Sequence, residues 1–415
     1  MIDVKLLCKR AKAASLKMAI LEPGVKTKAL RSMAKALINK SSYIITENAK
    51  DVKNAIKKNF SKALIDRLTL DEKRIIAMAD SLVEISKLKD PVGQVLETRS
   101  RPNALLIKKV RVPIGVILVI YESRPNVTSD CVGLSLKSGN CIILRGGSEA
   151  INSNTAIFEI LNREALNNKL PDGAITMIKD TDRKIVNALL SQEGLIDLVM
   201  PRGGESLIRE VSRNSRIPVI KHYKGVCHTY VDKAADLKMA EKICFNAKVQ
   251  RPGVCNAMET MLVDKKIAKK FLPRMIERFK DANVEIRGCS ETIKIVSGIK
   301  RANEKDWYAE YLDLILSIKV VNNIDEAIAH IMKYGSYHSD AIVTGDKKAA
   351  EKFLNEVDSA CVYVNASTRF TDGGQFGKGA EIGISTDKIH ARGPVGVEEL
   401  TSYKYVVYGK GQIRK

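Results

Sequence analysis

The run I-G-V-I-L-V-I-Y, from Ile114 to Tyr121, is apolar and largely β-branched. A strand covered on both faces of a sheet has this composition, because none of its side chains meets water. Further short apolar runs follow it, separated by stretches with helical periodicity: Cys141–Leu144, Ala174–Ile178, Leu195–Met200 and Ile217–Ile220. Strands that alternate with helices at this spacing predict an α/β fold, built on a parallel sheet with helices on both faces.

Two of these predicted strands end in a glycine turn before a predicted helix, Arg145-Gly146-Gly147-Ser148 and Arg202-Gly203-Gly204-Glu205. Glycine lets the backbone approach a phosphate, the start of a helix supplies N–H groups, and arginine adds donors. An ordinary turn would explain either one alone, and no G-x-G-x-x-G fingerprint is present. Two such turns on one sheet favour a nucleotide site, and Arg145 would suit the 2′-phosphate of NADP.

The stretch K-V-Q-R-P-G-V-C-N-A, from Lys248 to Ala257, contains the candidate nucleophile Cys255. Pro252 cannot continue the helix predicted before it, and Gly253 permits a turn, so Cys255 is expected at a helix-to-strand corner. A nucleophilic cysteine needs exposure and a neighbour that favours the thiolate, and Arg251 is the candidate for that neighbour. The alternative is that Cys255 is one of eight ordinary small apolar residues.

The rest of the chain is divided around these blocks. Residues before about position 90 have helical periodicity, and a second, smaller α/β pattern follows the Cys255 stretch. Leu105–Val112 and Leu400–Gly409 have strand patterns outside both blocks, which suggests arms that pair subunits into a homo-oligomer, a dimer or a tetramer. We therefore predict a cofactor-binding domain (1–104 and 121–232), a catalytic domain (233–384) and oligomerisation arms (105–120 and 385–415).

The composition limits the class of protein. With 415 residues, 45% of them apolar, the chain is long enough for two or three globular domains. No apolar run reaches the roughly 18 residues of a membrane span, and the first residues do not form a secretory signal. The eight cysteines include no C-x-x-C pair, which favours free thiols in a reducing cytoplasm.

The net charge of +21 allows three interpretations. Lysines are scattered along the whole chain, so solvated helix faces explain most of the charge. A positive field would also attract small anions. Nucleic-acid binding is the third interpretation, but aromatic residues make up only 5% of the chain, which leaves little for base stacking. We expect a small anionic substrate and neither a nucleic-acid nor a membrane partner.

The five histidines predict no metal site. His222 and His228 share parity on one predicted strand, with Cys227 between them. No carboxylate or second cysteine stands at ligand spacing from them, so this pattern is a weak metal signal. The other histidines lie alone in the sequence: His330, His338 and His390.

Long motifs follow one another in a recognisable order along the chain. They are Y-E-S-R-P-N-V from Tyr121, L-R-G-G-S-E from Leu144, P-R-G-G from Pro201, Q-R-P-G-V-C-N from Gln250, Y-V-N-A-S-T-R-F-T-D-G from Tyr363 and H-A-R-G-P-V-G from His390. In this order the chain resembles the aldehyde dehydrogenase superfamily over nearly its whole length. Within it, the chain is most similar to the branch that reduces L-glutamyl 5-phosphate with NADPH to L-glutamate 5-semialdehyde and phosphate, in proline biosynthesis.

The resemblance implies an aldehyde-dehydrogenase-like fold and assigns two catalytic positions. Cys255 would attack the acyl phosphate and form a thioester, and its own backbone N–H would be one oxyanion donor. Ser123 replaces an asparagine that supplies a second oxyanion donor in many members. Ser123 is therefore the candidate at that position, although the identity of the second donor stays open.

The resemblance also assigns binding positions for NADP. Glu310, in A-E-Y-L-D-L, matches a glutamate that holds the nicotinamide ribose, and Ser148 and Glu149 fall where members contact the adenine ribose. The substrate carries a carboxylate and a phosphate, so we expect cationic side chains around it. Arg251 and Arg369 are the candidates, because of their charge and their positions in loops.

One departure from the superfamily bears on the reaction. Hydrolytic members carry a glutamate, in an E-L-G-G segment, that activates water to cleave the thioester. The corresponding run is His222-Tyr223-Lys224-Gly225, which contains no carboxylate. Water attack should then be slow, and phosphate becomes the acyl acceptor in the reverse direction. Because His222 could itself act as a base, an acylating or hydrolytic aldehyde dehydrogenase for another semialdehyde stays the alternative.

Overall fold

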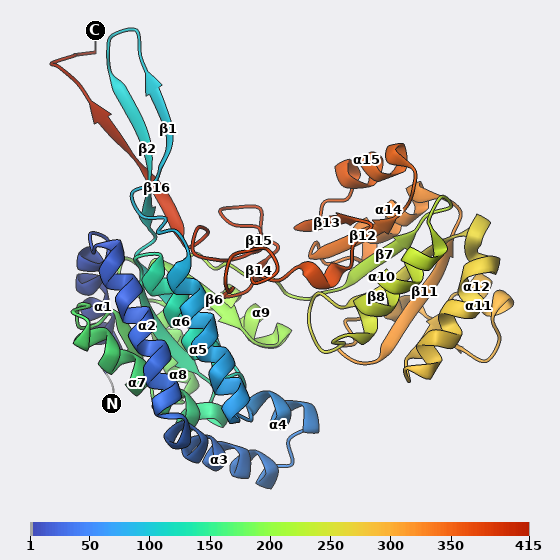
Figure 1. Cartoon of the computed structure of the whole chain (residues 1–415), viewed down its shortest axis with the longest axis horizontal. Coiled ribbons are helices and arrows are strands. Elements are labelled where there is room, and N and C mark those ends of the chain that lie inside the picture. Colours follow the sequence, from blue (N-terminus) through green and yellow to red (C-terminus); the bar gives the residue numbers. More distant parts are fainter. Residues whose placement is uncertain (1–2, 415) are drawn as a thin grey trace. The chain divides into compact units, whose positions relative to one another are not determined.

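The computed structural model describes residues 3–414, which form two compact units (Figure 1). The first unit contains the chain up to Lys221, together with Gly377–Gly383 and the chain from Pro394 onward. The second unit contains His222–Phe376 and Ile384–Gly393. No described helix is both long and apolar enough to cross a membrane.

Helices form the beginning of the first unit, as the periodicity predicted. They are α1 (Val4–Met18), α2 (Pro23–Asn39), α3 (Ser41–Lys57), α4 (Lys62–Leu68) and α5 (Glu72–Lys87). In α2 the buried side chains recur at three- and four-residue steps, for example Leu30, Met33 and Leu37, so that one face of the helix packs against the core. Asp71 caps α5, because its carboxylate accepts a hydrogen bond from the Arg74 N–H.

A parallel sheet in the order β5-β4-β3-β6 follows. Its strands are β3 (Val116–Tyr121), β4 (Cys141–Gly146), β5 (Ile175–Met177) and β6 (Leu198–Arg202). Its helices are α6 (Asn126–Lys137), η1 (Ser148–Ala150), α7 (Ile151–Asn167), α8 (Arg183–Leu190) and α9 (Glu205–Asn214). Every residue of β3 is buried, and the predicted α/β fold with a parallel sheet is confirmed.

Two predictions for the first unit are wrong. Ile217–Ile220 is not a strand, because only an isolated bridge joins Val219 to Val199 and Pro218 has no N–H to extend the pairing. The range 105–120 is not one arm either, since β3 begins at Val116 inside the parallel sheet.

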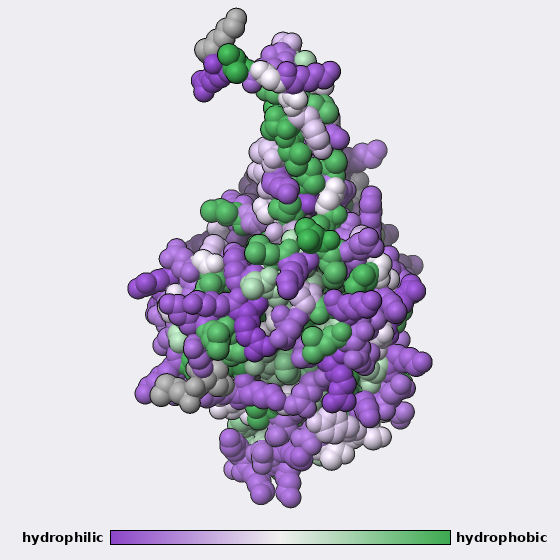
Figure 2. All heavy atoms as spheres, turned by 90° about the vertical axis from the view of Figure 1, so that its left-hand side faces the viewer, coloured by the Kyte–Doolittle hydropathy of each residue, from purple (hydrophilic) through white to green (hydrophobic). Residues whose placement is uncertain are grey.

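An antiparallel ribbon in the order β1-β2-β16 also belongs to the first unit (Figure 1). Its strands are β1 (Val95–Ser100), β2 (Leu106–Pro113) and β16 (Thr401–Tyr408). The sequence predicted β2 and β16 but not β1, because Pro91, Gly93 and Pro102 lie on either side of it and are residues typical of loops. Figure 2 shows hydrophobic side chains along the ribbon, and its exposed members include Val95, Leu96, Tyr403, Tyr405, Val407 and Tyr408.

The second unit contains a parallel sheet in the order β10-β9-β11-β8-β7-β12-β13. Its strands are β7 (Cys227–Val231), β8 (Met258–Asp264), β9 (Glu285–Gly288), β10 (Lys300–Arg301), β11 (Ile315–Val321), β12 (Ser339–Val343) and β13 (Cys361–Val364). Its helices are α10 (Leu237–Val249), α11 (Lys265–Asp281), α12 (Ser290–Ile295), α13 (Glu304–Trp307), α14 (Ile324–Tyr334), α15 (Lys347–Glu356) and η2 (Thr368–Phe370). The short strands β14 (Ile384–Ser385) and β15 (Gly393–Pro394) follow.

Strand β7 pairs with β8 and β12, so the second unit begins near His222 rather than at the predicted position 233. Helices cover both faces of its sheet. In β8, Met261 packs in a core cluster with Phe271 of α11, and the next residue, Leu262, packs in another cluster with Phe353 of α15. Successive side chains of a strand point to opposite faces, which explains why β8 is apolar on both.

Candidate active site

Cys255 lies in the turn between α10 and β8, at the helix-to-strand corner that the sequence predicted. Helix α10 ends at Val249, and the backbone turns through Pro252 and Gly253 before β8 begins at Met258. The Cys255 side chain is half-buried, and Cys289 is the other cysteine with this exposure; the remaining cysteines are buried. The corner therefore gives Cys255 the access that a nucleophile needs.

Burial separates most of the other thiols from this chemistry. It raises the pKa of the Cys8 thiol to about 11 and that of the Cys141 thiol to about 12. It also raises the pKa of Cys227 well above its ordinary value, and the Cys227 thiol donates a hydrogen bond to the Cys255 carbonyl oxygen at 3.2 Å. Cys227 is thus a protonated donor that holds the backbone of Cys255 in place.

Gly225 packs directly against the backbone of Cys255. A Cβ atom at Gly225 would lie 1.9 Å from the Cys255 carbonyl oxygen and 2.5 Å from its Cα atom. The His222–Gly225 segment therefore lies against the nucleophile turn, as expected of the segment that carries the water-activating base in hydrolytic members. Only a residue without a Cβ atom can make this approach.

Gly225→Ala is expected to displace the Cys255 turn and lower kcat by about 100-fold, because a misplacement of roughly 1 Å has an effect of this size. Steady-state kinetics would measure the loss. Gly24→Ala is a matched control, since a Cβ atom there would meet nothing within 4 Å. Normal kcat in Gly225→Ala would show that the close packing does not position the thiol.

Two imidazoles lie beside Cys255. One donor atom from each of His222, Cys255 and His338 lies within 4.8 Å of the other two. The sequence missed this group, because β7 begins only at Cys227 and His222 does not share a strand with His228. His338 enters from the start of β12, far along the chain, and no local pattern could have paired it with Cys255. An imidazole next to a thiol can accept its proton.

Arg369 contacts residues that precede and follow Cys255 in the sequence. Its Nε donates to the Gln250 side chain at 2.9 Å, and its Nη1 donates to the side-chain oxygen of Asn256. Burial lowers the pKa of the Arg369 guanidinium, and the positive charge of Arg251 lowers it further. The two predicted arginines therefore lie near each other and near the thiol, where they can bind an anionic acyl group.

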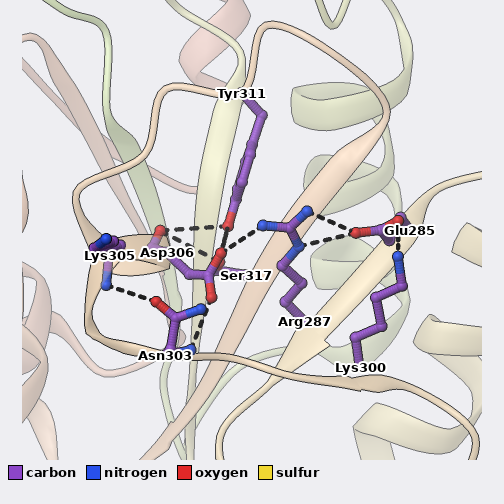
Figure 3. Close-up of polar contacts among 8 residues, drawn as sticks. All are labelled: Glu285, Arg287, Lys300, Asn303, Lys305, Asp306, Tyr311 and Ser317. Atoms are coloured by element: carbon purple, nitrogen blue, oxygen red, sulfur yellow. Dashed lines mark hydrogen bonds and ion pairs between the residues drawn. The ribbon is translucent and has the colours of Figure 1, made fainter.

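Glu310 lies at the same turn, since its carboxylate accepts a hydrogen bond from the Gly225 N–H at 2.8 Å. A polar network anchors the segment that carries it (Figure 3). Arg287 on β9 donates to the Asp306 carboxylate at 2.6 Å, and the Tyr311 hydroxyl reaches Asp306 at 3.0 Å and Ser317 at 2.8 Å. This network fixes the chain on both sides of Glu310.

Apart from Glu310, which lies in the second unit, the predicted cofactor residues lie in the first unit, at the carboxyl ends of its strands. From β3 the chain adds β4 and β5 on one side of the sheet and then returns to add β6 on the other side of β3. Ligands of parallel sheets bind at such a switch point, at the carboxyl ends of the two strands. Gly203 and Gly204 follow β6, and the Gly204 N–H donates to Glu122 at 3.0 Å. After β3, Ser123 donates to Glu149 from its N–H at 2.6 Å and its hydroxyl at 2.9 Å. The role of Ser123 as an oxyanion donor stays a prediction.

These turns fit a dinucleotide. A Cβ atom at Gly146 would lie 2.3 Å from the Asn154 side chain, so the turn packs closely against α7 at this glycine. Arg145 donates to the Thr181 carbonyl at 2.8 Å, and burial lowers the pKa of its guanidinium. Ser148 is exposed at the start of η1. A carboxylate such as Glu149 suits ribose hydroxyls, and a guanidinium suits phosphate.

Known proteins share both the sequence and the fold. The aldehyde dehydrogenase family model matches residues 2–306. A gamma-glutamyl phosphate reductase of Thermodesulfovibrio yellowstonii is 59% identical over 407 residues, which cover 98% of this chain and 97% of that protein. The crystal structure of gamma-glutamyl phosphate reductase from Thermotoga maritima has a TM-score of 0.97 at 47% identity, with 100% of both chains covered. An acetylating aldehyde dehydrogenase from Geobacillus thermoglucosidasius shares the fold, with a TM-score of 0.71 at 18% identity over 100% of this chain and 98% of that one.

The chain therefore belongs to the aldehyde dehydrogenase family, and it is an oxidoreductase of a family that uses a nicotinamide cofactor. Its identity to the two gamma-glutamyl phosphate reductases above is 59% and 47%, over nearly the whole chain. Within the family it groups with the gamma-glutamyl phosphate reductases.

Proposed function

We propose that this enzyme reduces L-glutamyl 5-phosphate to L-glutamate 5-semialdehyde and phosphate in proline biosynthesis, with NADPH as the reductant. The proposal rests on relatives of that name and on one arrangement in the second unit. The half-buried thiol of Cys255 lies next to the imidazoles of His222 and His338. The guanidinium of Arg369 binds the residues on either side of this turn, Gln250 and Asn256. The His222–Gly225 segment contains no carboxylate.

The first step is acyl transfer to Cys255. Its sulfur attacks the acyl carbon, the carbon–oxygen bond to phosphate breaks, and phosphate leaves with its electron pair. His222 or His338 accepts the thiol proton. The backbone N–H of Cys255 stabilises the oxyanion, and Arg251 and Arg369 neutralise the phosphate. The product of this step is a thioester on Cys255.

The second step is reduction. A bound nicotinamide cofactor supplies the hydride that converts the thioester to the aldehyde. Cys255 then leaves as the thiolate and recovers a proton. Glu310 would hold the nicotinamide ribose, and Arg145, Ser148 and Glu149 would hold the adenosine end, where the guanidinium of Arg145 would favour the 2′-phosphate of NADPH. The His222–Gly225 segment contains no carboxylate base to activate water, so water competes poorly with hydride.

We further propose that the β1-β2-β16 ribbon is an oligomerisation arm. It exposes apolar and tyrosine side chains, and a second subunit would cover them. The free thiols of the chain suit a cytoplasmic location.

The reverse reaction tests the proposal. With L-glutamate 5-semialdehyde and NADP⁺, the full chain is expected to form NADPH only when phosphate is present, because phosphate must cleave the thioester. Absorbance of the reduced cofactor would follow the reaction, and NAD⁺ in parallel assays would test the cofactor preference. Equal rates without phosphate would show a hydrolytic enzyme, and the proposal would then be wrong.

A further inference from the structure

The group formed by His222, Cys255 and His338 has a second chemical property besides proton transfer. Two imidazole nitrogens and a thiolate sulfur are ligands that zinc-like cations prefer, and the three donor atoms lie within 4.8 Å of one another. We propose that these residues form a reversible binding site for a thiophilic divalent cation such as Zn²⁺, which switches the enzyme off by occupying Cys255. This site goes beyond the proposed reaction, which needs no metal.

The spacing requires only a small adjustment. In a tetrahedral zinc site with the usual bond lengths, neighbouring donor atoms are about 3.4–3.6 Å apart. The separations between donor atoms, at most 4.8 Å, would therefore shorten by up to about 1.4 Å. His222 and Cys255 are half-buried and can make this movement, whereas His338 is fully buried and serves as the fixed ligand. Solvent would supply the fourth ligand.

Neighbouring hydroxyls orient the fixed ligand. The Nδ1 atom of His338 lies 2.9 Å from the Ser339 hydroxyl, which lies 2.6 Å from the Thr371 hydroxyl. The Tyr363 hydroxyl continues this chain, 2.7 Å from Thr371. Metal-binding histidines usually have their second nitrogen engaged in this way. We therefore assign Nε2 of His338 to the cation.

The donor set selects the cation and determines the effect. Sulfur and imidazole ligands favour Zn²⁺ over Mg²⁺ or Ca²⁺, which prefer oxygen. As the metal–sulfur bond forms, the thiol proton passes to solvent. The electron pair of the Cys255 sulfur is then shared with the metal, so the sulfur does not attack an acyl carbon until the cation leaves.

Cobalt binding would test the site directly. Titration of the metal-free full chain with Co²⁺ is expected to give one equivalent of binding and a near-ultraviolet sulfur-to-cobalt absorption band. His222→Gln and His338→Gln should each weaken this binding by about 100-fold or more, since loss even of an outer hydrogen-bond partner costs about 10–100-fold. Cys255→Ser should remove the band. Cys289→Ser, at the other half-buried thiol, is the matched control and should retain it.

Zinc should also inhibit the enzyme in proportion to occupancy, and a chelator should restore activity. His338 is fully buried, so the His338→Gln variant could fail to fold. His222 is half-buried, and the His222→Gln variant then provides the test. The absorption band is measured without substrate, so its result does not depend on the proposed reaction. The metal site can therefore fail its test while the proposed reaction is confirmed, and the proposed reaction can fail while the metal site is confirmed. No band, or a band of unchanged affinity in His222→Gln, would overturn the site.

Discussion

Cys255→Ala is expected to lower kcat/KM by about 10⁴-fold or more, the largest effect of any single substitution in this chain. Without the sulfur no thioester can form at position 255, and the alanine that replaces it has no nucleophilic atom. The binding groups around it, Arg369 and Glu310, stay in place, so KM should change far less than kcat. Phosphate-dependent NADPH formation from L-glutamate 5-semialdehyde would measure both constants.

The matched control is Cys289→Ala, which removes the other half-buried thiol and should retain normal kinetics. Mass spectrometry of the wild-type enzyme mixed with acyl phosphate, in the absence of a reductant, should show a single acyl adduct on the peptide that contains Cys255. A Cys255→Ala enzyme with more than about 1% of wild-type kcat would exclude the thioester route.

The fold could be predicted wherever the signal was local. A continuous β-branched run identified β3, and glycine turns identified the ends of β4 and β6. The prediction failed where pairing decides the structure. Strand β1 is exposed along most of its length and exists because β2 pairs with it, so its own sequence carries no strand pattern. The Ile217–Ile220 run has a strand-like composition, but Pro218 limits its pairing.

The active site likewise contains residues that local sequence patterns could predict and contacts that they could not. Cys255 could be found because Pro252 and Gly253 break the helix next to it, and Arg369 because of its charge and its predicted position in a loop. Other contacts join residues that are distant in the chain. Gly225 against Cys255 and His338 beside His222 arise only when β7, β8 and β12 become neighbours. No periodicity or spacing encodes such contacts.

A buried ion pair near the active site is another contact that the sequence could not predict. The Lys248 ammonium and the Glu259 carboxylate are 2.6 Å apart, and both side chains are fully buried. Lys248 lies in α10, before the nucleophile turn, and Glu259 lies in β8, after it. Glu259 also accepts a hydrogen bond from the Leu312 N–H at 3.2 Å, two residues beyond Glu310. The pair therefore joins both sides of the Cys255 turn to the segment that carries Glu310.

Lys248→Met is expected to destabilise the second unit by about 3–5 kcal/mol, because it leaves Glu259 buried without a countercharge. Trp307, the single tryptophan, is buried in that unit, so its fluorescence during denaturant unfolding would report the change. The double variant Lys248→Met/Glu259→Gln removes both charges but keeps an acceptor for Leu312, and should recover most of the loss. Lys294→Met, at an exposed pair with Glu291, is the control and should change the midpoint little.

The pH dependence of this loss identifies its cause. Burial raises the pKa of Glu259 from 4.5 to about 7. A carboxyl whose pKa is higher in the folded than in the unfolded state binds its proton more tightly when folded, so stability falls as pH rises between the two values. The charge and hydrogen bond of Lys248 lower this pKa, so the carboxyl in Lys248→Met keeps its proton to a higher pH than in the wild-type protein. The deficit of Lys248→Met relative to wild type should therefore be small near about pH 5, where both proteins hold the proton, and grow above about pH 7. The double variant has no carboxyl at position 259, so this titration should not contribute to the pH dependence of its stability. A deficit of Lys248→Met that does not change with pH would mean that lost packing of the lysine stem, rather than the uncompensated charge of Glu259, destabilises the unit.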